Sequence, residues 1–213
     1  MNDAGASKSS GVFVEPSPFN LANGFTFLRV LLVPVIGFLL VASAADEPGI
    51  PSSARWWAFA IFVFAAWTDS IDGWLARRLV GVTRWGQLAD PLADKLLIIG
   101  SLAILAALDE LPWWAVAVIV VREIAVTWQR AVLVRDLNVV MPASVWGKVK
   151  TVTQVLAVTM YLYPGVVSGA RQSALTVALI ATVGSGVEYV GRVRRLRVAN
   201  QRIEQDLPDE SSR

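Results

Sequence analysis

The chain contains neither cysteine nor histidine, and charged residues are scarce. Without these two residues it forms no disulfide and builds no zinc finger, cysteine nucleophile, Ser-His-Asp triad or histidine-ligated haem site. Any acid–base or metal chemistry must therefore use Asp, Glu, Lys or Arg. The formal net charge of +2 gives no overall electrostatic support for binding nucleic acid, so no nucleic-acid partner is expected.

Apolar residues dominate what is present. Of the 213 residues, 55% are hydrophobic and 17% are charged, whereas soluble domains carry about a quarter charged residues. Six apolar stretches each approach the roughly 20 residues that a helix needs to cross a bilayer. They cover residues 25–45, 56–80, 86–108, 112–134, 149–163 and 173–190. The sequence therefore predicts an all-α integral membrane protein with six transmembrane helices.

Basic residues mark one side of these helices. They flank the second and fourth predicted loops and follow the last helix, whereas the other side carries only Arg55 and Arg171. The positive-inside rule then places both termini in the cytoplasm. We expect a disordered cytoplasmic tail over 1–18, a six-helix catalytic domain over 19–198 and a polar cytoplasmic tail over 199–213. The protein would be a multi-pass component of the cell membrane.

Four aspartates lie inside two of the predicted helices, where ionisable residues are costly and mark function. Asp69 and Asp72 share one face of the second helix, and Asp90 and Asp94 share one face of the third. Because these helices are antiparallel neighbours joined by a short loop, we expect the two acidic faces to meet at one depth. Clustered carboxylates repel unless cations neutralise them, and all-oxygen sites suit Mg²⁺ or Mn²⁺.

Small residues accompany the acids on the same two faces. Gly73, Ala76 and Gly86 remove bulk, as a ligand lying flat on the helices would require, and Arg77 adds a positive charge for phosphate. A purely structural interpretation pairs the aspartates with neighbouring basic residues such as Lys95 in salt bridges between helices. Four acids on two matched faces exceed what packing needs, which favours a binding site.

The spacing of these eight residues resembles the signature of the CDP-alcohol phosphotransferase family. It reads Asp-x2-Asp-Gly-x2-Ala-Arg-x8-Gly-x3-Asp-x3-Asp over residues 69–94. The resemblance implies the six-helix fold of that family, which usually forms homodimers. It also implies an enzyme that transfers a substituted phosphoryl group from a CDP-linked donor to an alcohol and releases CMP.

The same resemblance implies roles for the individual side chains. Asp69, Asp72 and Asp90 would hold two metal ions, with Asp94 as a further ligand or close neighbour. Asp94 would also be the general base for the acceptor hydroxyl. The residues that would line the CMP site are Gly73, Ala76, Arg77 and Gly86.

Further stretches resemble bacterial phosphatidylglycerophosphate synthases. Asn23, Thr26 and Arg29 match the opening pattern of those enzymes, although Ala22 stands where the pattern has proline. These three residues would lie near the diphosphate or at the entry to the first helix. Arg29 has a second interpretation, because a long basic side chain near a helix start can also extend to the membrane interface.

Two basic stretches in the second half of the chain also resemble these synthases. One contains Arg122 and Glu123, and the other runs from Trp146 through Lys148 and Lys150. By this resemblance Arg122, Lys148 and Lys150 would bind the phosphate of the acceptor. Alternatively, Arg122 and Glu123 form a local ion pair, and the lysines are ordinary cytoplasmic flanking residues.

The resemblance implies CDP-diacylglycerol as donor, with its acyl chains among the membrane lipids, and sn-glycerol 3-phosphate as acceptor. Other enzymes of the superfamily use phosphatidylglycerol or inositol phosphate, so these acceptors stay open at this point. A divalent-cation transporter is the alternative outside the enzyme class. It would need a path to the outer face, which the apolar outer halves of the second and third helices do not offer.

Overall fold

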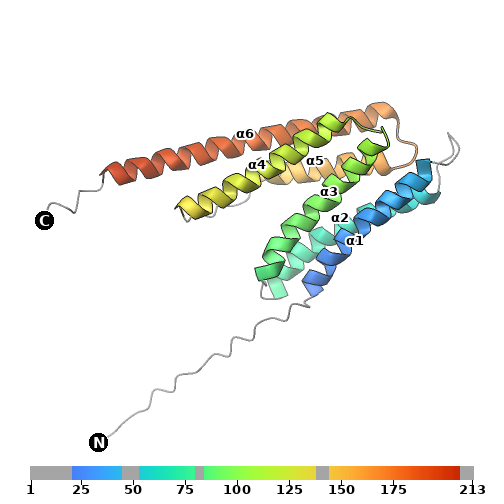
Figure 1. The fold of residues 1–213 in the computed structure, drawn as a ribbon, viewed down its shortest axis with the longest axis horizontal. Coiled ribbons are helices and arrows are strands. Elements are labelled where there is room, and N and C mark those ends of the chain that lie inside the picture. Colours follow the sequence, from blue (N-terminus) through green and yellow to red (C-terminus); the bar gives the residue numbers. More distant parts are fainter. Residues whose placement is uncertain (1–20, 45–52, 80–83, 138–143, 207–213) are drawn as a thin grey trace, which may run out of the picture.

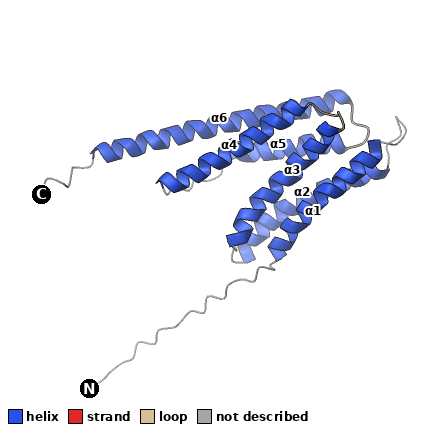
Figure 2. Cartoon of the chain, viewed as in Figure 1, coloured by secondary structure: helices blue, strands red, loops and turns tan. Residues whose placement is uncertain are grey.

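A computed structural model describes residues 21–44, 53–79, 84–137 and 144–206 (Figure 1). For residues 21–26, 69–79, 84–94, 136–137 and 200–206 the description covers the helical backbone alone. Within these ranges the chain forms six α-helices and no strand (Figure 2), so the all-α prediction is confirmed. The helices are α1 (Leu21–Ala44), α2 (Ser53–Leu79), α3 (Arg84–Ala107), α4 (Trp113–Leu137), α5 (Val145–Leu162) and α6 (Ser168–Asp206).

The six helices correspond one for one to the six predicted apolar stretches. The largest difference is at α6, whose 39 residues run well beyond the expected 173–190. Hydropathy detects only the apolar part of a helix. Beyond Val190 the chain continues through arginine, leucine and glutamate, which are good helix formers without being uniformly apolar.

Local signals set several helix ends. The Ser144 side chain caps α5 by accepting a hydrogen bond from the Gly147 amide at 2.9 Å. After α3, Asp109 adopts a positive φ of 58°, and the Glu110 amide donates to the Leu105 carbonyl at 3.0 Å. Such a left-handed residue followed by a backward hydrogen bond is a common way to close a helix, and it turns the chain directly into α4.

The helices pack as two groups. α1 lies against α2 and α3, while α6 lies against α4 and α5 (Figure 1). Contacts of α3 with α4 and α5, and of α2 with α5, join the groups. The shared apolar core draws on all six helices, through buried residues such as Ile36, Phe62, Leu105, Ile119, Val158 and Leu175.

One glycine permits a close helix approach within the first group. A Cβ placed on Gly100 of α3 would lie 2.6 Å from Cγ1 of Val33 on α1. Real side chains do not approach so closely, so α1 and α3 can pack at this separation because residue 100 has no side chain.

A half-buried charged cluster joins the two groups near the α3–α4 turn. Arg55 of α2 donates to both carboxylate oxygens of Glu110, at 2.7 and 2.5 Å, and to the Tyr161 carbonyl of α5 at 2.6 Å. Arg171 of α6 lies 3.7 Å from the same carboxylate. Glu110 therefore partners both basic residues that the predicted topology places on the non-cytoplasmic side.

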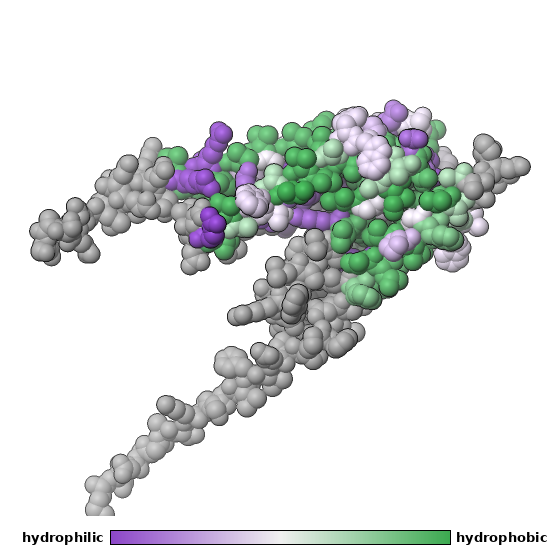
Figure 3. Space-filling model, in the orientation of Figure 1, coloured by the Kyte–Doolittle hydropathy of each residue, from purple (hydrophilic) through white to green (hydrophobic). Residues whose placement is uncertain are grey.

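The face shown in Figure 3 is apolar over much of its described area. Large side chains such as Phe38 and Trp128 are more than 70% exposed. Among the described residues, Phe27–Ala44 and Ser168–Ala199 are long and apolar enough to cross a bilayer. An exposed apolar surface of this extent is consistent with a membrane protein. The remaining four helices contain charged residues or extend into undescribed side chains, so six spans and their orientation stay predictions.

Candidate active site

The predicted metal and CMP residues occupy the C-terminal part of α2 and the N-terminal part of α3. Both segments are helical, as the argument for shared faces requires. Their side chains lie outside the described residues, so the convergence of the acidic faces stays a prediction. This applies to Asp69, Asp72, Gly73, Ala76, Arg77, Gly86, Asp90 and Asp94, and likewise to Asn23 and Thr26 of α1.

A basic cavity of about 450 Å³ opens among α3, α4 and α5. Its volume falls in the range of small-molecule sites. Its described charged lining consists of five cations and one carboxylate, namely Lys95, Arg122, Arg130, Lys148, Lys150 and Glu123. Lys95 directly follows Asp94 along α3, so this pocket begins where the predicted acidic site ends.

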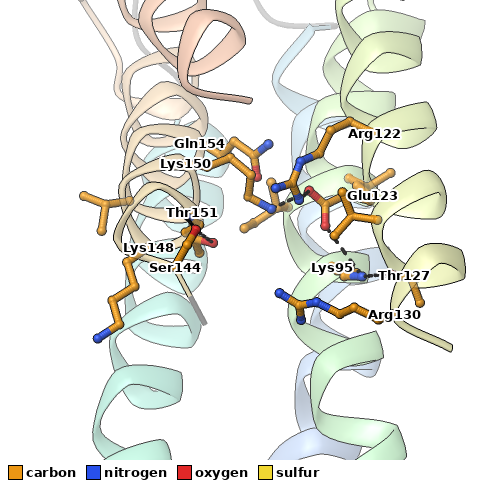
Figure 4. A pocket seen from close by; sticks show the side chains of 15 residues that line it. Lys95, Arg122, Glu123, Thr127, Arg130, Ser144, Lys148, Lys150, Thr151 and Gln154 are labelled. Atoms are coloured by element: carbon orange, nitrogen blue, oxygen red, sulfur yellow. Dashed lines mark hydrogen bonds and ion pairs between the residues drawn. The ribbon is translucent and has the colours of Figure 1, made fainter. Parts of the chain in front are cut away.

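Glu123 lies at the centre of the pocket's charged contacts (Figure 4). It is only 6% exposed, and its Oε1 accepts hydrogen bonds from Arg122 Nη1 at 3.1 Å and from Lys150 Nζ. Its Oε2 lies 3.5 Å from Lys95 Nζ, which also donates to Thr127 Oγ1 at 2.6 Å. One carboxylate on α4 thus contacts cations from α3, α4 and α5.

Arg122 is held from a second direction by α6. Its Nη2 donates to Ser185 Oγ at 3.0 Å, and the Ser185 hydroxyl donates to the Thr182 carbonyl at 2.9 Å. Gln154 of α5 donates to the Thr182 hydroxyl at 2.9 Å, which extends this polar layer across the bundle. The Nε of Arg122 is buried without a hydrogen-bond partner in the described structure. The guanidinium is therefore oriented yet keeps unused donors.

The third predicted acceptor residue, Lys148, lies at the rim. Its side chain is exposed, and in Figure 4 its ammonium points away from Lys150 and Arg122. Arg130 instead points toward the cavity, and its guanidinium carbon lies 5.6 Å above the centre of the Tyr189 ring. Of the three predicted acceptor residues, Arg122 and Lys150 therefore both contact Glu123, whereas Lys148 does not.

Arg29 of α1 is buried, with 5% of its surface exposed. The side chain lies against protein, which disfavours the interpretation that it extends outward to the membrane interface. Whether it lies near the donor's diphosphate stays a prediction.

Sequence reasoning did not group Lys95, Thr127 and Arg130 with the predicted acceptor residues, although all three line the same cavity. A signal for two of them was present, because Glu123, Thr127 and Arg130 are spaced i, i+4 and i+7 and share one helical face. Lys95 was considered only as a salt-bridge partner for the aspartates. Its described contacts are with Thr127 and Glu123 on α4.

Comparison with known proteins agrees with the sequence signature. A family model described as CDP-alcohol phosphatidyltransferase matches residues 19–184, which is most of the chain. The chain belongs to this family. The resemblance drawn from the aspartate signature is thereby confirmed, and the chain is an enzyme of the phosphatidyltransferase type.

Curated relatives cover most of the chain. A "Probable phosphatidylglycerophosphate synthase" of Mycobacterium tuberculosis (strain H37Rv) is 42% identical over 178 residues, covering 83% of this chain and 82% of the relative. A "CDP-diacylglycerol--glycerol-3-phosphate 3-phosphatidyltransferase" of Bacillus subtilis (strain 168) is 39% identical, covering 82% of this chain and 95% of the relative. A protein of the same name from Pectobacterium atrosepticum is 34% identical, covering 83% and 96%.

Proposed function

We propose that this chain transfers the phosphatidyl group of CDP-diacylglycerol to sn-glycerol 3-phosphate, giving phosphatidylglycerophosphate and CMP. The observation that carries the proposal is the excess of cations in a pocket that begins at Lys95, one residue after Asp94. Such a pocket suits an acceptor that carries phosphate, through charge-assisted hydrogen bonds. The names of the bacterial relatives describe the same donor and acceptor.

Donor binding is assigned to α2, α3 and the start of α1. The nucleotide would lie on the small-residue faces, and its phosphates near Arg77 and Arg29. The full set proposed for the donor comprises Gly73, Ala76, Arg77 and Gly86 for CMP, and Asn23, Thr26 and Arg29 for the diphosphate side.

The acidic faces are proposed to hold two divalent ions, Mg²⁺ or Mn²⁺, through Asp69, Asp72 and Asp90, with Asp94 beside them. The residues fit such ions, because carboxylate oxygens are their preferred ligands and the helical backbone gives each pair of aspartates one face. When bound, the ions supply positive charge that neutralises the donor's diphosphate.

The protein's own side chains position the acceptor and accept its proton during the transfer. The acceptor hydroxyl oxygen bonds to the phosphorus that carries diacylglycerol, while the bond from that phosphorus to the CMP oxygen breaks and CMP departs with that oxygen. The carboxylate of Asp94 accepts the hydroxyl proton. Arg122 and Lys150 bind the phosphate group at the opposite end of the acceptor from the reacting hydroxyl. This contact fixes the direction in which the hydroxyl points.

We further propose that all six helices cross the cytoplasmic membrane and that both termini lie in the cytoplasm. The basic residues that favour this orientation include the lining of the acceptor pocket, so the water-soluble acceptor would enter from the cytoplasm. The acyl chains of the donor would stay in lipid. Residues 19–198 would form the catalytic domain between polar segments 1–18 and 199–213, and the enzyme would act as a homodimer.

A single assay tests the proposed reaction. Purified protein with CDP-diacylglycerol and Mg²⁺ or Mn²⁺ is offered glycerol 3-phosphate, phosphatidylglycerol or inositol phosphate in parallel, and CMP release is followed. We expect rapid CMP release with glycerol 3-phosphate and little or none with the other two acceptors. Release with phosphatidylglycerol or inositol phosphate but not with glycerol 3-phosphate would overturn the acceptor assignment and leave the family assignment intact.

A further inference from the structure

We propose that Glu123 is a positioning residue of the acceptor pocket: its carboxylate assembles Lys95, Arg122 and Lys150 and leaves a net charge that matches a phosphate monoester. The inference rests on the proposed function, because it concerns the pocket assigned there to glycerol 3-phosphate. Glu123 contacts no reacting atom in this account and acts only through the three cations.

The contacts show that Glu123 gathers these cations from separate helices. Its Oε1 binds Arg122 and Lys150, and its Oε2 faces Lys95 at 3.5 Å. Side-chain exposure is 7% for Glu123, 9% for Lys150 and 14% for Arg122, so the centre of the cluster is largely removed from solvent. Three cations held this close would repel one another without the carboxylate between them.

The charge of the cluster separates this role from a purely structural ion pair. A structural pair needs one cation for one carboxylate, whereas here three cations surround a single carboxylate. Among the described contacts of this cluster, two positive charges therefore have no carboxylate of their own in a partly buried site, which is unfavourable unless an anion completes it. A phosphate monoester carries about two negative charges near neutral pH. A phosphodiester such as phosphatidylglycerol carries one, so it would leave the cluster incompletely neutralised.

The cations also keep donors for such an anion. Arg122 donates one N–H of Nη1 to Glu123 and one N–H of Nη2 to Ser185, and each of these nitrogens carries a second N–H. Lys150 donates one hydrogen bond to Glu123 out of the three that an ammonium offers. Glu123 thus orients the cations and leaves some of their N–H donors unused.

The test is Glu123→Gln in the full-length enzyme, with Glu123→Asp as the conservative variant. We expect Glu123→Gln to raise the KM for glycerol 3-phosphate about ten- to a hundredfold, while kcat and the KM for CDP-diacylglycerol change less than about threefold. Glu123→Asp keeps the charge and should recover much of the lost acceptor affinity. The matched control is Glu188→Gln, which removes a half-buried carboxylate paired with Arg192 on α6, outside the pocket.

A double variant tests whether Glu123 acts through Lys150. If it does, adding Glu123→Gln to Lys150→Ala should raise the acceptor KM much less than it does in the wild-type background. Fully multiplicative effects would overturn the proposal. A lower acceptor KM in Glu123→Gln would also overturn it, because the carboxylate would then compete with the acceptor. An equal loss of kcat and of both substrate affinities would overturn it too, because that result indicates a general structural role.

Failure of the proposed function can be distinguished from failure of this inference. If the wild-type enzyme releases no CMP with glycerol 3-phosphate, the proposed function fails, and inorganic phosphate becomes the probe of the pocket. Phosphate should then raise the thermal midpoint of the wild-type protein and of Glu188→Gln but not that of Glu123→Gln. Equal shifts in all three proteins would overturn the role of Glu123. The same measurement decides the matter if Glu123→Gln is folded but too slow to assay.

Discussion

Lys148 and Lys150 lie two residues apart on α5, and both were predicted to bind the acceptor's phosphate. The structure separates them, since Lys150 is buried against Glu123 whereas Lys148 is exposed at the rim of the cavity. We therefore predict that Lys150→Ala raises the KM for glycerol 3-phosphate far more than Lys148→Ala does. The two variants remove the same chemical group from the same helix, so each is the control for the other.

The expected magnitudes follow from the two environments. The Lys150 side chain is 9% exposed, and a hydrogen bond from a charged group there contributes about 1.5–3 kcal/mol, which corresponds to about a ten- to hundredfold change in KM. An exposed charge is screened by water and salt and contributes about 0–1 kcal/mol, or at most about fivefold. Loss of Lys150 still leaves Glu123 paired with Arg122 and Lys95, so the variant should remain folded.

Initial rates of CMP release at saturating CDP-diacylglycerol, measured over a range of glycerol 3-phosphate concentrations, give the two acceptor KM values. A second series at saturating acceptor gives the KM for the donor, which should change less than about threefold in both variants. Equal effects of the two substitutions, or a larger effect at Lys148, would refute the assignment of the acceptor's phosphate to the Glu123 cluster.

Three further outcomes are expected. Asp72→Asn should abolish CMP release at every Mg²⁺ or Mn²⁺ concentration while the protein still inserts and folds, and near-normal turnover would contradict the metal assignment. In this cysteine-free chain, a single cysteine at Gly165 should react with an impermeant reagent outside intact cells, and one at Val82 should not; the reverse pattern would invert the topology. Gly100→Ala should lower the thermal midpoint, because its Cβ would come within 2.6 Å of an α1 methyl group and overpacking costs about 1–3 kcal/mol. Gly184→Ala is the control and should not lower the midpoint, because a Cβ at residue 184 would meet open space.

The number and approximate position of the helices could be predicted from sequence, because a segment of about 20 apolar residues has few alternatives to a helix. The end of α6 could not be predicted in this way. After Val190 the helix continues to Asp206 through charged residues, and neither hydropathy nor apolar periodicity marks where such a helix stops. The close packing of α1 against α3 at Gly100 could not be predicted either, because it depends on which helix packs against that residue.

For a related reason, the sequence indicated only some of the residues that line the basic cavity we assign to the acceptor. Arg122 and Lys150 were chosen because they match stretches of related enzymes, and they do share one centre through Glu123. Lys95 belongs to a different helix, and a single sequence does not reveal contacts between helices. The charge of Lys95 could be assigned to the neighbouring aspartates or to α4 equally well until the packing of α3 on α4 was known.

The origin of the pocket's lining has a consequence for how acceptor preference can change. Apart from Lys95 and two isoleucines of α3, the pocket is built from α4, α5 and the cap of α5, whereas the residues proposed for donor chemistry lie on α1, α2 and the first half of α3. In the proposed arrangement, the two substrates are therefore bound by different stretches of the chain. Substitutions within α4 and α5 could exchange one acceptor for another without touching the acidic signature. A single catalytic apparatus can in this way serve several headgroup chemistries.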